Sequence, residues 1–158
     1  MKLEVMPLDK SHIPEMKFLI AGYLNSSSNG IEESESSPEL LEQCDQILNR
    51  LLSDNSAFCF VATQEYESLG FIVLSWSFSL SKGYPVLRIE ALYSSPGHRK
   101  KGVGRKLLQH AIDLAYSKKA ARLQLETDED NVPARALYKK LGFTLIQGKD
   151  VYMSFLPL

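Results

Sequence analysis

Apolar residues recur along the chain at two spacings, which divide it into expected helices and strands. Spacings of three and four residues predict amphipathic helices. These helices are expected over residues 13–25, 38–52 and 103–119. Ser37 and Pro38 form a typical start for the second of them. A shorter helix is expected between Asn131, a residue type that caps helix N-termini, and Gly142, which marks a helix end.

Short apolar runs bounded by turn residues predict strands. The expected strands are residues 3–8, 57–63, 70–79, 86–93, 121–127, 144–147 and 149–155. The elements follow the order β-α-α-β-β-β-α-β-α-β-β. This order predicts an α/β fold (α+β, with a mixed sheet) whose helices lie on both sides of the sheet. Because the order contains no repeat and no linker, residues 1–158 are expected to form a single domain.

Composition excludes several classes of protein. Hydrophobic residues make up 44% of the chain and charged residues 23%, which is ordinary for a soluble globular protein. No apolar run has the length of a membrane span, so no membrane partner is expected. The N-terminal segment is broken by Glu4 and Asp9, so a first strand is expected there and no signal peptide.

The cysteines and histidines show no pattern of a metal or disulfide site. Cys44 falls on an apolar helix face and Cys59 in an apolar strand, so both are expected to be buried thiols in a reducing, cytoplasmic location. The 3 histidines have no metal-ligand spacing, so no metal is expected.

The net charge of −1 hides an opposite charge in the two halves of the sequence. Residues 1–80 contain 4 Lys and Arg and 12 Asp and Glu, whereas residues 81–158 contain 14 and 7. The C-terminal half therefore suits a polyanion, and the acidic half could face a cationic partner. Attraction between the two halves within the fold is the simpler alternative.

A basic loop with two glycines links the strand at 86–93 to the helix at 103–119. Gly102 and Gly104 let a bulky anion approach the unpaired N–H groups at the helix N-terminus. The helix dipole and the cations of the loop add positive charge, which indicates a phosphate or pyrophosphate site. These cations are Arg99, Lys100, Lys101, Arg105 and Lys106. A P-loop is excluded because Val103 and Gly104 follow Gly102, and a dinucleotide fingerprint is excluded because its third glycine is missing.

Two motifs carry a resemblance to a known family. Residues 99–104 have the form R-x-x-G-x-G, and residues 131–143 have the form N-x-x-A-x-x-L-Y-x-x-x-G-F. They resemble the two signatures of the GNAT superfamily of N-acetyltransferases. The resemblance implies a single GNAT-type domain with a splayed central sheet, and acetyl-CoA as the acetyl donor. The segment I-E-A-L-Y at 89–93 is similar to the I-E-D-L-Y of diamine and related small-amine acetyltransferases, but Ala91 replaces their acid, which weighs against a polyamine substrate.

The resemblance also implies where acetyl-CoA binds. The strands at 86–93 and 121–127 would part at their C-terminal ends and admit the pantetheine arm. The arm would pair with the backbone at Leu92, Tyr93 and Ser94, and an N–H near Leu92 would polarise the acetyl carbonyl. The pyrophosphate would contact Arg99 and the amides of Lys100, Lys101, Gly102, Val103, Gly104 and Arg105. In the second motif, the residues that bind the donor would be Asn131, beside the arm or an ordered water, Ala134 and Tyr138.

Acetylation of a primary amine requires a base, because an amine with a pKa of roughly 10.4 is mostly protonated at neutral pH. Glu90 and Glu126 lie at suitable strand ends, and the resemblance implies one of them as this base, acting directly or through a water. Glu90, the first choice, matches the acid of the I-E-D-L-Y segment, and Glu126 matches the proposed base of other family members. The alternatives are an ion pair of Glu90 with Arg88 or Arg122, and a solvated or ion-paired Glu126. The resemblance implies Tyr138 as the acid that protonates the leaving thiolate, with packing beside the pantetheine as its alternative.

The favoured function is direct transfer of acetyl from acetyl-CoA to the primary amine of a small molecule. The alternatives are a protein N-terminal or lysine acetyltransferase, and a regulatory module that binds acyl-CoA without turnover. Residues 31–37, acidic and rich in serine, are either a solvated loop or a lid over the acceptor. Nucleic-acid binding is disfavoured because the chain is acidic overall and the basic loop lacks aromatic residues. The two terminal strands could pair with a second copy, which would give a homodimer.

Overall fold

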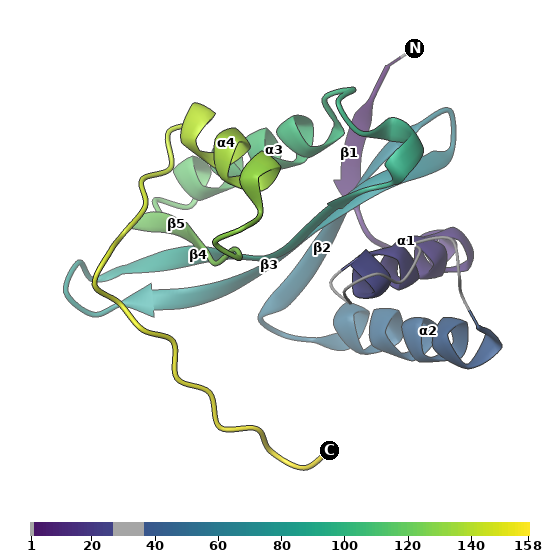
Figure 1. Ribbon diagram of the computed structural model, residues 1–158, viewed down its shortest axis with the longest axis horizontal. Coiled ribbons are helices and arrows are strands. Elements are labelled where there is room, and N and C mark those ends of the chain that lie inside the picture. Colours follow the sequence, from purple (N-terminus) through teal and green to yellow (C-terminus); the bar gives the residue numbers. More distant parts are fainter. Residues whose placement is uncertain (1, 27–36) are drawn as a thin grey trace. The chain divides into compact units, whose positions relative to one another are not determined.

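A five-stranded sheet organises the first part of the chain (Figure 1). The computed structural model describes residues 2–26 and 37–158, and the chain divides into two units, Met1–Glu126 and Thr127–Leu158. The acidic segment interpreted as a loop or a lid lies, except for Ser37, outside the described residues.

The strands lie side by side in the order in which they occur along the chain. They are β1 (Glu4–Pro7), β2 (Ala57–Gln64), β3 (Glu67–Ser79), β4 (Tyr84–Ser94) and β5 (Arg122–Leu125). Strands β1 to β4 pair antiparallel, and β5 pairs with β4 in parallel. A parallel pair needs a long crossover connection, and here that connection contains the third helix. The predicted mixed sheet is confirmed.

Helices cover both faces of the sheet, as the element order predicted. Helices α1 (Ile13–Ser26) and α2 (Pro38–Ser53) pack together on one face, and α3 (Val103–Ser117) packs on the other (Figure 1). Short 3-10 turns precede α1, at Lys10–His12, and the basic loop, at Pro96–His98. No helix within the described residues is both long and apolar enough to cross a membrane.

The start of α2 shows why the sequence signals located it well. The Ser37 hydroxyl accepts a hydrogen bond from the Leu40 N–H at 3.1 Å, and Pro38 occupies the first turn. The cap satisfies one of the amides that a helix start leaves unpaired, and proline needs no partner there.

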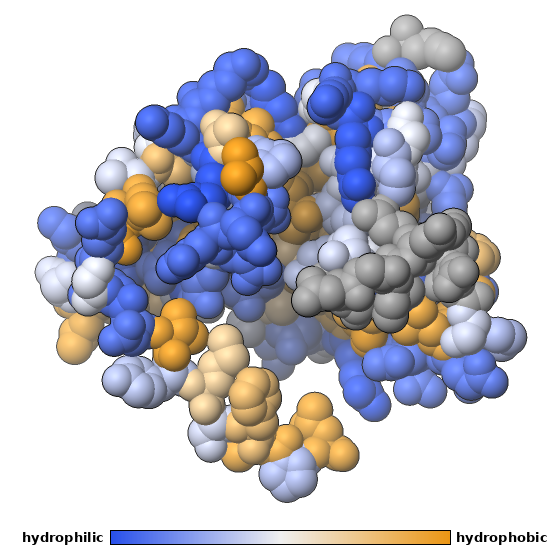
Figure 2. Space-filling view, in the orientation of Figure 1, coloured by the Kyte–Doolittle hydropathy of each residue, from blue (hydrophilic) through white to orange (hydrophobic). Residues whose placement is uncertain are grey.

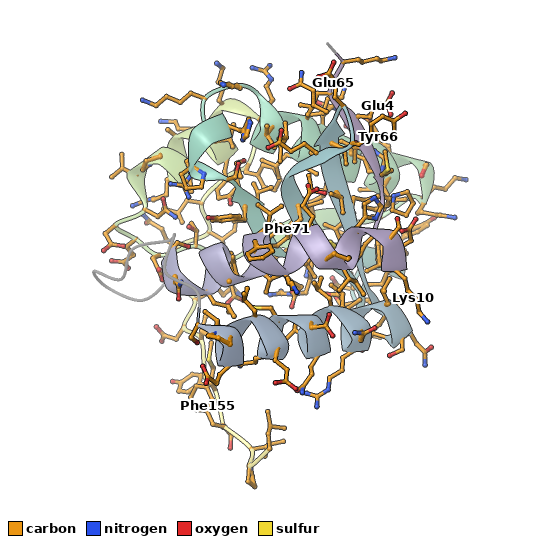
Figure 3. All side chains as sticks on the ribbon, turned by 90° about the vertical axis from the view of Figure 1, so that its right-hand side faces the viewer. Glu4, Lys10, Glu65, Tyr66, Phe71 and Phe155 are labelled. Atoms are coloured by element: carbon orange, nitrogen blue, oxygen red, sulfur yellow. The ribbon has the colours of Figure 1, made fainter. Side chains whose placement is uncertain are left out.

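Phe71 of β3, labelled in Figure 3, lies in the core between the sheet and the helix pair. Its cluster includes Met16 of α1 and Leu48 of α2, both fully buried. On the other face, Leu107 and Leu108 of α3 are also fully buried. Burying one such side chain contributes about 1.5–3 kcal/mol to stability. Packing on both faces therefore holds β3 and β4, the strands that support the basic loop.

The second unit contains one helix, α4 (Val132–Lys140), and no strand. The strands predicted at 144–147 and 149–155 are therefore wrong. Most of their apolar side chains are exposed, and the C-terminal end of the chain shows mainly hydrophobic surface (Figure 2). A two-stranded hairpin alone is marginal in water, and no residue of Thr127–Leu158 is buried, so this unit has no packed core on which such a hairpin rests. The homodimer expected from these strands loses its basis.

Candidate active site

β4 and β5 stop pairing part-way along β4. Their last registered pair is Ile89 with Leu125, whereas β4 continues to Ser94 alongside β3. The residues predicted to pair with pantetheine lie on this extension of β4, beyond the reach of β5. They are Leu92, Tyr93 and Ser94. The ladder between β4 and β5 thus ends before this stretch, at the place where the resemblance implies that the strands part.

A β-bulge at Glu90 lies at the same point. Across β3 and β4, Val73 pairs with Ala91 and Leu74 pairs with Ile89, so Glu90 is an extra residue in β4. Bulges bend a strand, re-aim side chains and are common beside active sites. The bend thus falls on a residue that was predicted as the base.

Arg88 contacts both predicted bases. Its Nε donates to Glu90 Oε1 at 3.2 Å, and its Nη2 donates to Glu126 Oε1 at 3.0 Å. Hydrogen bonding to Glu126, and to a lesser extent to Glu90, raises the pKa of Arg88, because the charged guanidinium gains both contacts. The Arg88 side chain is 27% exposed, against 44% for Glu90 and 53% for Glu126. The carboxylates of this ion-paired cluster are thus accessible from solvent.

These contacts show which partner each of the two glutamates has. The ion pair of Glu90 with Arg88 is confirmed, and Glu126 is an ion-paired strand end as well. Arg122 instead donates from its Nε to Gln124 Oε1 at 2.9 Å. Because ion pairing does not prevent an exposed carboxylate from accepting a proton, both glutamates remain candidates for the base.

The basic loop is anchored where it leaves β4. The Arg99 Nε donates to the Ser94 carbonyl oxygen at 3.2 Å, and the Arg99 guanidinium lies 5.5 Å from the centre of the Tyr93 ring. The side chains of Ser95 and His98 are hydrogen-bonded at 2.7 Å. The loop cation nearest the strand is thus tied to the β4 extension.

Gly102 begins α3 without a side-chain cap. It has the left-handed conformation, with φ of 83°, and its carbonyl accepts the first helical hydrogen bond, from Lys106. A Cβ at Gly102 would meet no atom within 4 Å, so the space beside the helix start is open. The N–H groups of Val103, Gly104 and Arg105 have no acceptor within the helix.

These features fit a pyrophosphate. Amides without an acceptor in the helix and the positive end of the α3 dipole adjoin the open space at Gly102, and exposed cations stand on both sides of it. The exposed cations are Lys100, Lys101, Arg105 and Lys106. Lys100 itself has a positive φ of 65°, a conformation uncommon outside glycine, so the loop backbone is held in a special shape.

Tyr93 connects the β4 extension to α1. Its ring lies 6.2 Å from the ring of Tyr23 and 5.8 Å from that of Phe71. A Cβ at Gly22 of α1 would lie only 2.4 Å from the Tyr93 hydroxyl oxygen. This contact requires glycine at position 22, and through it α1 supports the strand that carries the loop.

The residues of the second motif lie in the second unit. Asn131 caps α4 by accepting a hydrogen bond from the Ala134 N–H at 3.3 Å. The Tyr138 ring is 5.8 Å from the Phe143 ring, and the Phe143 N–H donates to the Tyr138 carbonyl oxygen at 2.9 Å. Gly142, with φ of 93°, provides the turn that brings Phe143 back to Tyr138. The motif is thus a capped helix closed by an aromatic pair.

The predicted site residues fall into two groups. Glu90, Glu126, the β4 extension and the basic loop belong to the first unit, and Arg88 brings the two glutamates together. Asn131, Ala134 and Tyr138 belong to the second. Over residues 2–26 and 37–158, no group of three or more His, Cys, Asp or Glu could hold a metal ion.

Comparison with known proteins identifies the family. The model of the acetyltransferase (GNAT) family matches residues 23–143. The chain belongs to this family. A solved structure titled as a probable acetyltransferase has the same fold, with a TM-score of 0.80, 24% identity, and 98% of this chain and 97% of that one covered.

The names of two relatives point to different acetyl acceptors. Streptothricin acetyltransferase of Streptomyces lavendulae is 40% identical over 91 residues, which cover 58% of this chain and 46% of the relative. The chain thus spans about half the length of that relative. An N-alpha-acetyltransferase of Sulfurisphaera tokodaii is 32% identical over 124 residues, covering 68% of this chain and 73% of the relative.

Sequence reasoning missed three features of the site. The bulge at Glu90 and the contact of Gly22 with Tyr93 have no clear signal in the sequence. Half of the bridge from Arg88 to both glutamates was among the alternatives drawn from the sequence, in which Glu90 pairs with Arg88 or Arg122. Its other half required the register of β4 with β5.

Proposed function

We propose that this chain is an acetyl-CoA-dependent N-acetyltransferase that transfers acetyl directly to the primary amine of a small molecule. One observation carries the proposal: the open, uncapped start of α3 follows the stretch of β4 that has left β5, and Glu90 and Glu126 stand where those strands part. A site for an anion and a pair of candidate bases thus occur in one unit.

The basic loop would hold the pyrophosphate of acetyl-CoA through the first amides of α3 and the cations around them. The backbone of the β4 extension, from Leu92 to Ser94, would bind the pantetheine arm. Asn131, Ala134 and Tyr138 of the second motif complete the proposed set of residues that bind the donor. The family match includes parts of both units, which supports their belonging to one catalytic domain. Acetyl-CoA supplies the thioester.

The reaction needs two proton transfers. The amine nitrogen forms a bond to the acetyl carbon, and the carbon–sulfur bond breaks. The proton of the amine passes to Glu90 or Glu126, and the departing thiolate takes a proton from the Tyr138 hydroxyl. A thiolate whose thiol has a pKa near 8.5 makes a mild demand on that acid. No covalent enzyme intermediate is required.

A small-molecule acceptor is supported by the 40% identity to an enzyme named for streptothricin. The exposure of both carboxylates suits an acceptor that arrives as a cation. A protein N-terminus is the second candidate, supported by the relative named N-alpha-acetyltransferase, which matches more of this chain. The free, buried thiols of Cys44 and Cys59 are consistent with a reducing compartment, which supports a cytoplasmic location.

The experiment is the release of CoA thiol from acetyl-CoA in the presence of separate acceptors: streptothricin, an aminoglycoside, a polyamine, amino acids, and peptides with a free N-terminus or lysine. We expect release that depends on a small amine and falls by about 10²-fold or more in Tyr138→Phe. Release only with peptides would favour the second candidate. Tight binding of acetyl-CoA without release with any acceptor would contradict an enzyme and favour a regulatory module.

A further inference from the structure

We propose that Arg88 is a positioning residue for the transfer: its guanidinium holds Glu90 and Glu126 in fixed places where β4 and β5 part. This inference rests on the proposed function and assigns a role to a residue outside both motifs of the chain. Three observations carry it, namely the strand register, the geometry of the fork and the oxygens that it leaves available.

The register places the three side chains together. Arg88 pairs with Gln124 in the parallel ladder, and Glu90 and Glu126 each follow two positions later. Glu90 is the bulged residue of β4 and Glu126 directly follows the last residue of β5, and both carboxylates lie within hydrogen-bond reach of the Arg88 guanidinium. The last backbone pair is Ile89 with Leu125, so the strand ends beyond it are linked by the Arg88 side chain instead of the ladder.

The fork of the guanidinium makes two contacts of different direction. Nε reaches Glu90 along β4, and Nη2 reaches Glu126 across to β5, at 3.2 and 3.0 Å. The planar group fixes the angle between these donors, whereas a lysine ammonium is a point charge on a flexible stem. Arg88 therefore constrains where both carboxylates lie in relation to each other, which charge alone would not do.

The contacts leave each carboxylate able to act as a base. Both hydrogen bonds end on Oε1, and within the described residues no hydrogen bond is made by the Oε2 atom of Glu90 or of Glu126. The glutamates are also more exposed than Arg88 itself. An amine can thus deliver its proton to Oε2 while Oε1 keeps the side chain in place.

Kinetics of four variants test the role. In Arg88→Gln we expect kcat with an accepted amine to fall by about tenfold or more while the KM for acetyl-CoA stays unchanged, because misplaced catalytic groups cost rate and leave donor binding intact. Arg88→Lys, which keeps the charge, should fall between this variant and the wild type. Glu90→Gln and Glu126→Gln identify which carboxylate carries the loss. Unchanged kcat in Arg88→Gln would overturn the proposal.

Arg122→Lys is the matched control. Arg122 belongs to β5 and donates to Gln124 from the same strand, and no carboxylate contacts it among the described residues. We expect this variant to keep its kcat. An equal loss in Arg122→Lys and Arg88→Lys would overturn the proposal, because it would make any arginine of this sheet face equally important.

A measurement on the free protein does not depend on turnover. The Nε–H cross-peak of Arg88 in a ¹H–¹⁵N spectrum, assigned by its loss in Arg88→Lys, should shift in Glu90→Gln and stay in place in Arg122→Lys. If the cross-peak has the same chemical shift in Glu90→Gln as in the wild type, the positioning role is overturned even if turnover is present. A responding cross-peak in a chain without turnover overturns the proposed function and the catalytic role together, and so the two failures are distinguishable.

Discussion

At Gly22 of α1, the aromatic cluster around Tyr93 leaves no room for a side chain. A Cβ at this position would lie 2.4 Å from the Tyr93 hydroxyl oxygen and 3.1 Å from the ring carbon that bears it. Tyr93 is itself 6% exposed and packed against Tyr23 and Phe71, so its ring has little freedom to move. The clash would therefore be felt in the core.

We predict that Gly22→Ala destabilises the fold by about 1–3 kcal/mol, because overpacking of a filled core costs that much. The direction of the change in stability tests the packing, because alanine in a helix is favoured over glycine by about 1 kcal/mol when nothing obstructs it. Without the clash, Gly22→Ala would therefore stabilise the fold. The free energy of unfolding in urea measures the change. The control is Gly22→Ala in a protein that also carries Tyr93→Phe, which lacks the hydroxyl group. There, most of the loss in the free energy of unfolding should disappear. A Gly22→Ala variant more stable than the wild type would contradict the packing described.

At the residue scale, the sequence predicted which side chains lie at the strand ends but not their contacts. Glu90 and Glu126 were predicted from their places at strand ends and from the family resemblance, and both lie where the ladder between β4 and β5 ends. The choice between Arg88 and Arg122 as partner of Glu90 needed the structure: Arg122 lies opposite Val86 at the far end of the ladder and donates to Gln124, whereas Arg88 donates to Glu90. Local alternation indicates the face of a side chain and leaves its partner undetermined.

At the element scale, the loop and the start of α3 carry the proposed donor site. Gly102 has a positive φ of 83° and open space around its Cα, so a side chain there would meet no clash but would strain the backbone. Gly97, in the same loop, also has open space and is absent from the residues with positive φ in the described chain. Alanine would fit the space at both glycines but would strain the backbone only at Gly102. Comparing the two substitutions therefore separates the effect of backbone shape from that of side-chain bulk.

We predict that Gly102→Ala binds CoA about tenfold more weakly, because left-handed backbone costs a non-glycine residue about 1–2 kcal/mol and the loop would relax away from its shape. Gly97→Ala should bind CoA as the wild type does. Isothermal titration with CoA measures both. Equal affinities for the two variants would show that the shape at Gly102 does not matter for binding.

Among the elements, those with their own start and stop signals were predicted best. The helix expected over 38–52 is observed as Pro38–Ser53, because Ser37 and Pro38 define its start by chemistry that acts locally. The two terminal strands were predicted wrongly, because alternating apolar residues form a strand only when another strand or a helix covers them. The pattern of apolar residues does not tell whether another strand or a helix lies close enough to cover them.

At the scale of the whole molecule, the core between α1, α2 and the sheet contains both thiols. Cys44 is 0% exposed and Cys59 is 5% exposed. Burial raises the pKa of the Cys59 thiol from 9.0 to about 12, because the thiolate is poorly solvated there. The folded chain therefore keeps Cys59 neutral over a pH range in which the unfolded chain ionises it.

We predict that this difference makes stability fall at alkaline pH. The contribution is constant below pH 9.0, the value of the unfolded thiol, and is lost as the pH rises from there towards about 12. Urea unfolding between neutral pH and pH 10.5 measures the trend in the wild type and in Cys59→Ala. Because other groups titrate equally in both, the gap in stability between them should narrow above pH 9.0. A constant gap would contradict the burial of this thiol.

The family and the architecture of the whole molecule agree with the prediction from the sequence. The order of elements up to α4, the mixed sheet with helices on both faces and the family were all predictable, because they depend on many residues at once. The acceptor was not, because the residues that select it share no fixed spacing. The names of the relatives leave the same choice between a small molecule and a protein N-terminus.

The central claim is that the chain moves an acetyl group from CoA to an amine, and the most direct test is to follow the acetyl group itself. Acetyl-CoA labelled with ¹³C in the acetyl carbons is incubated with the chain and a mixture of small amines and peptides, and the products are analysed by mass spectrometry. The account predicts label in the amide of a small amine, at a rate that requires the chain. Label that stays in acetyl-CoA, or appears only in free acetate, would contradict it.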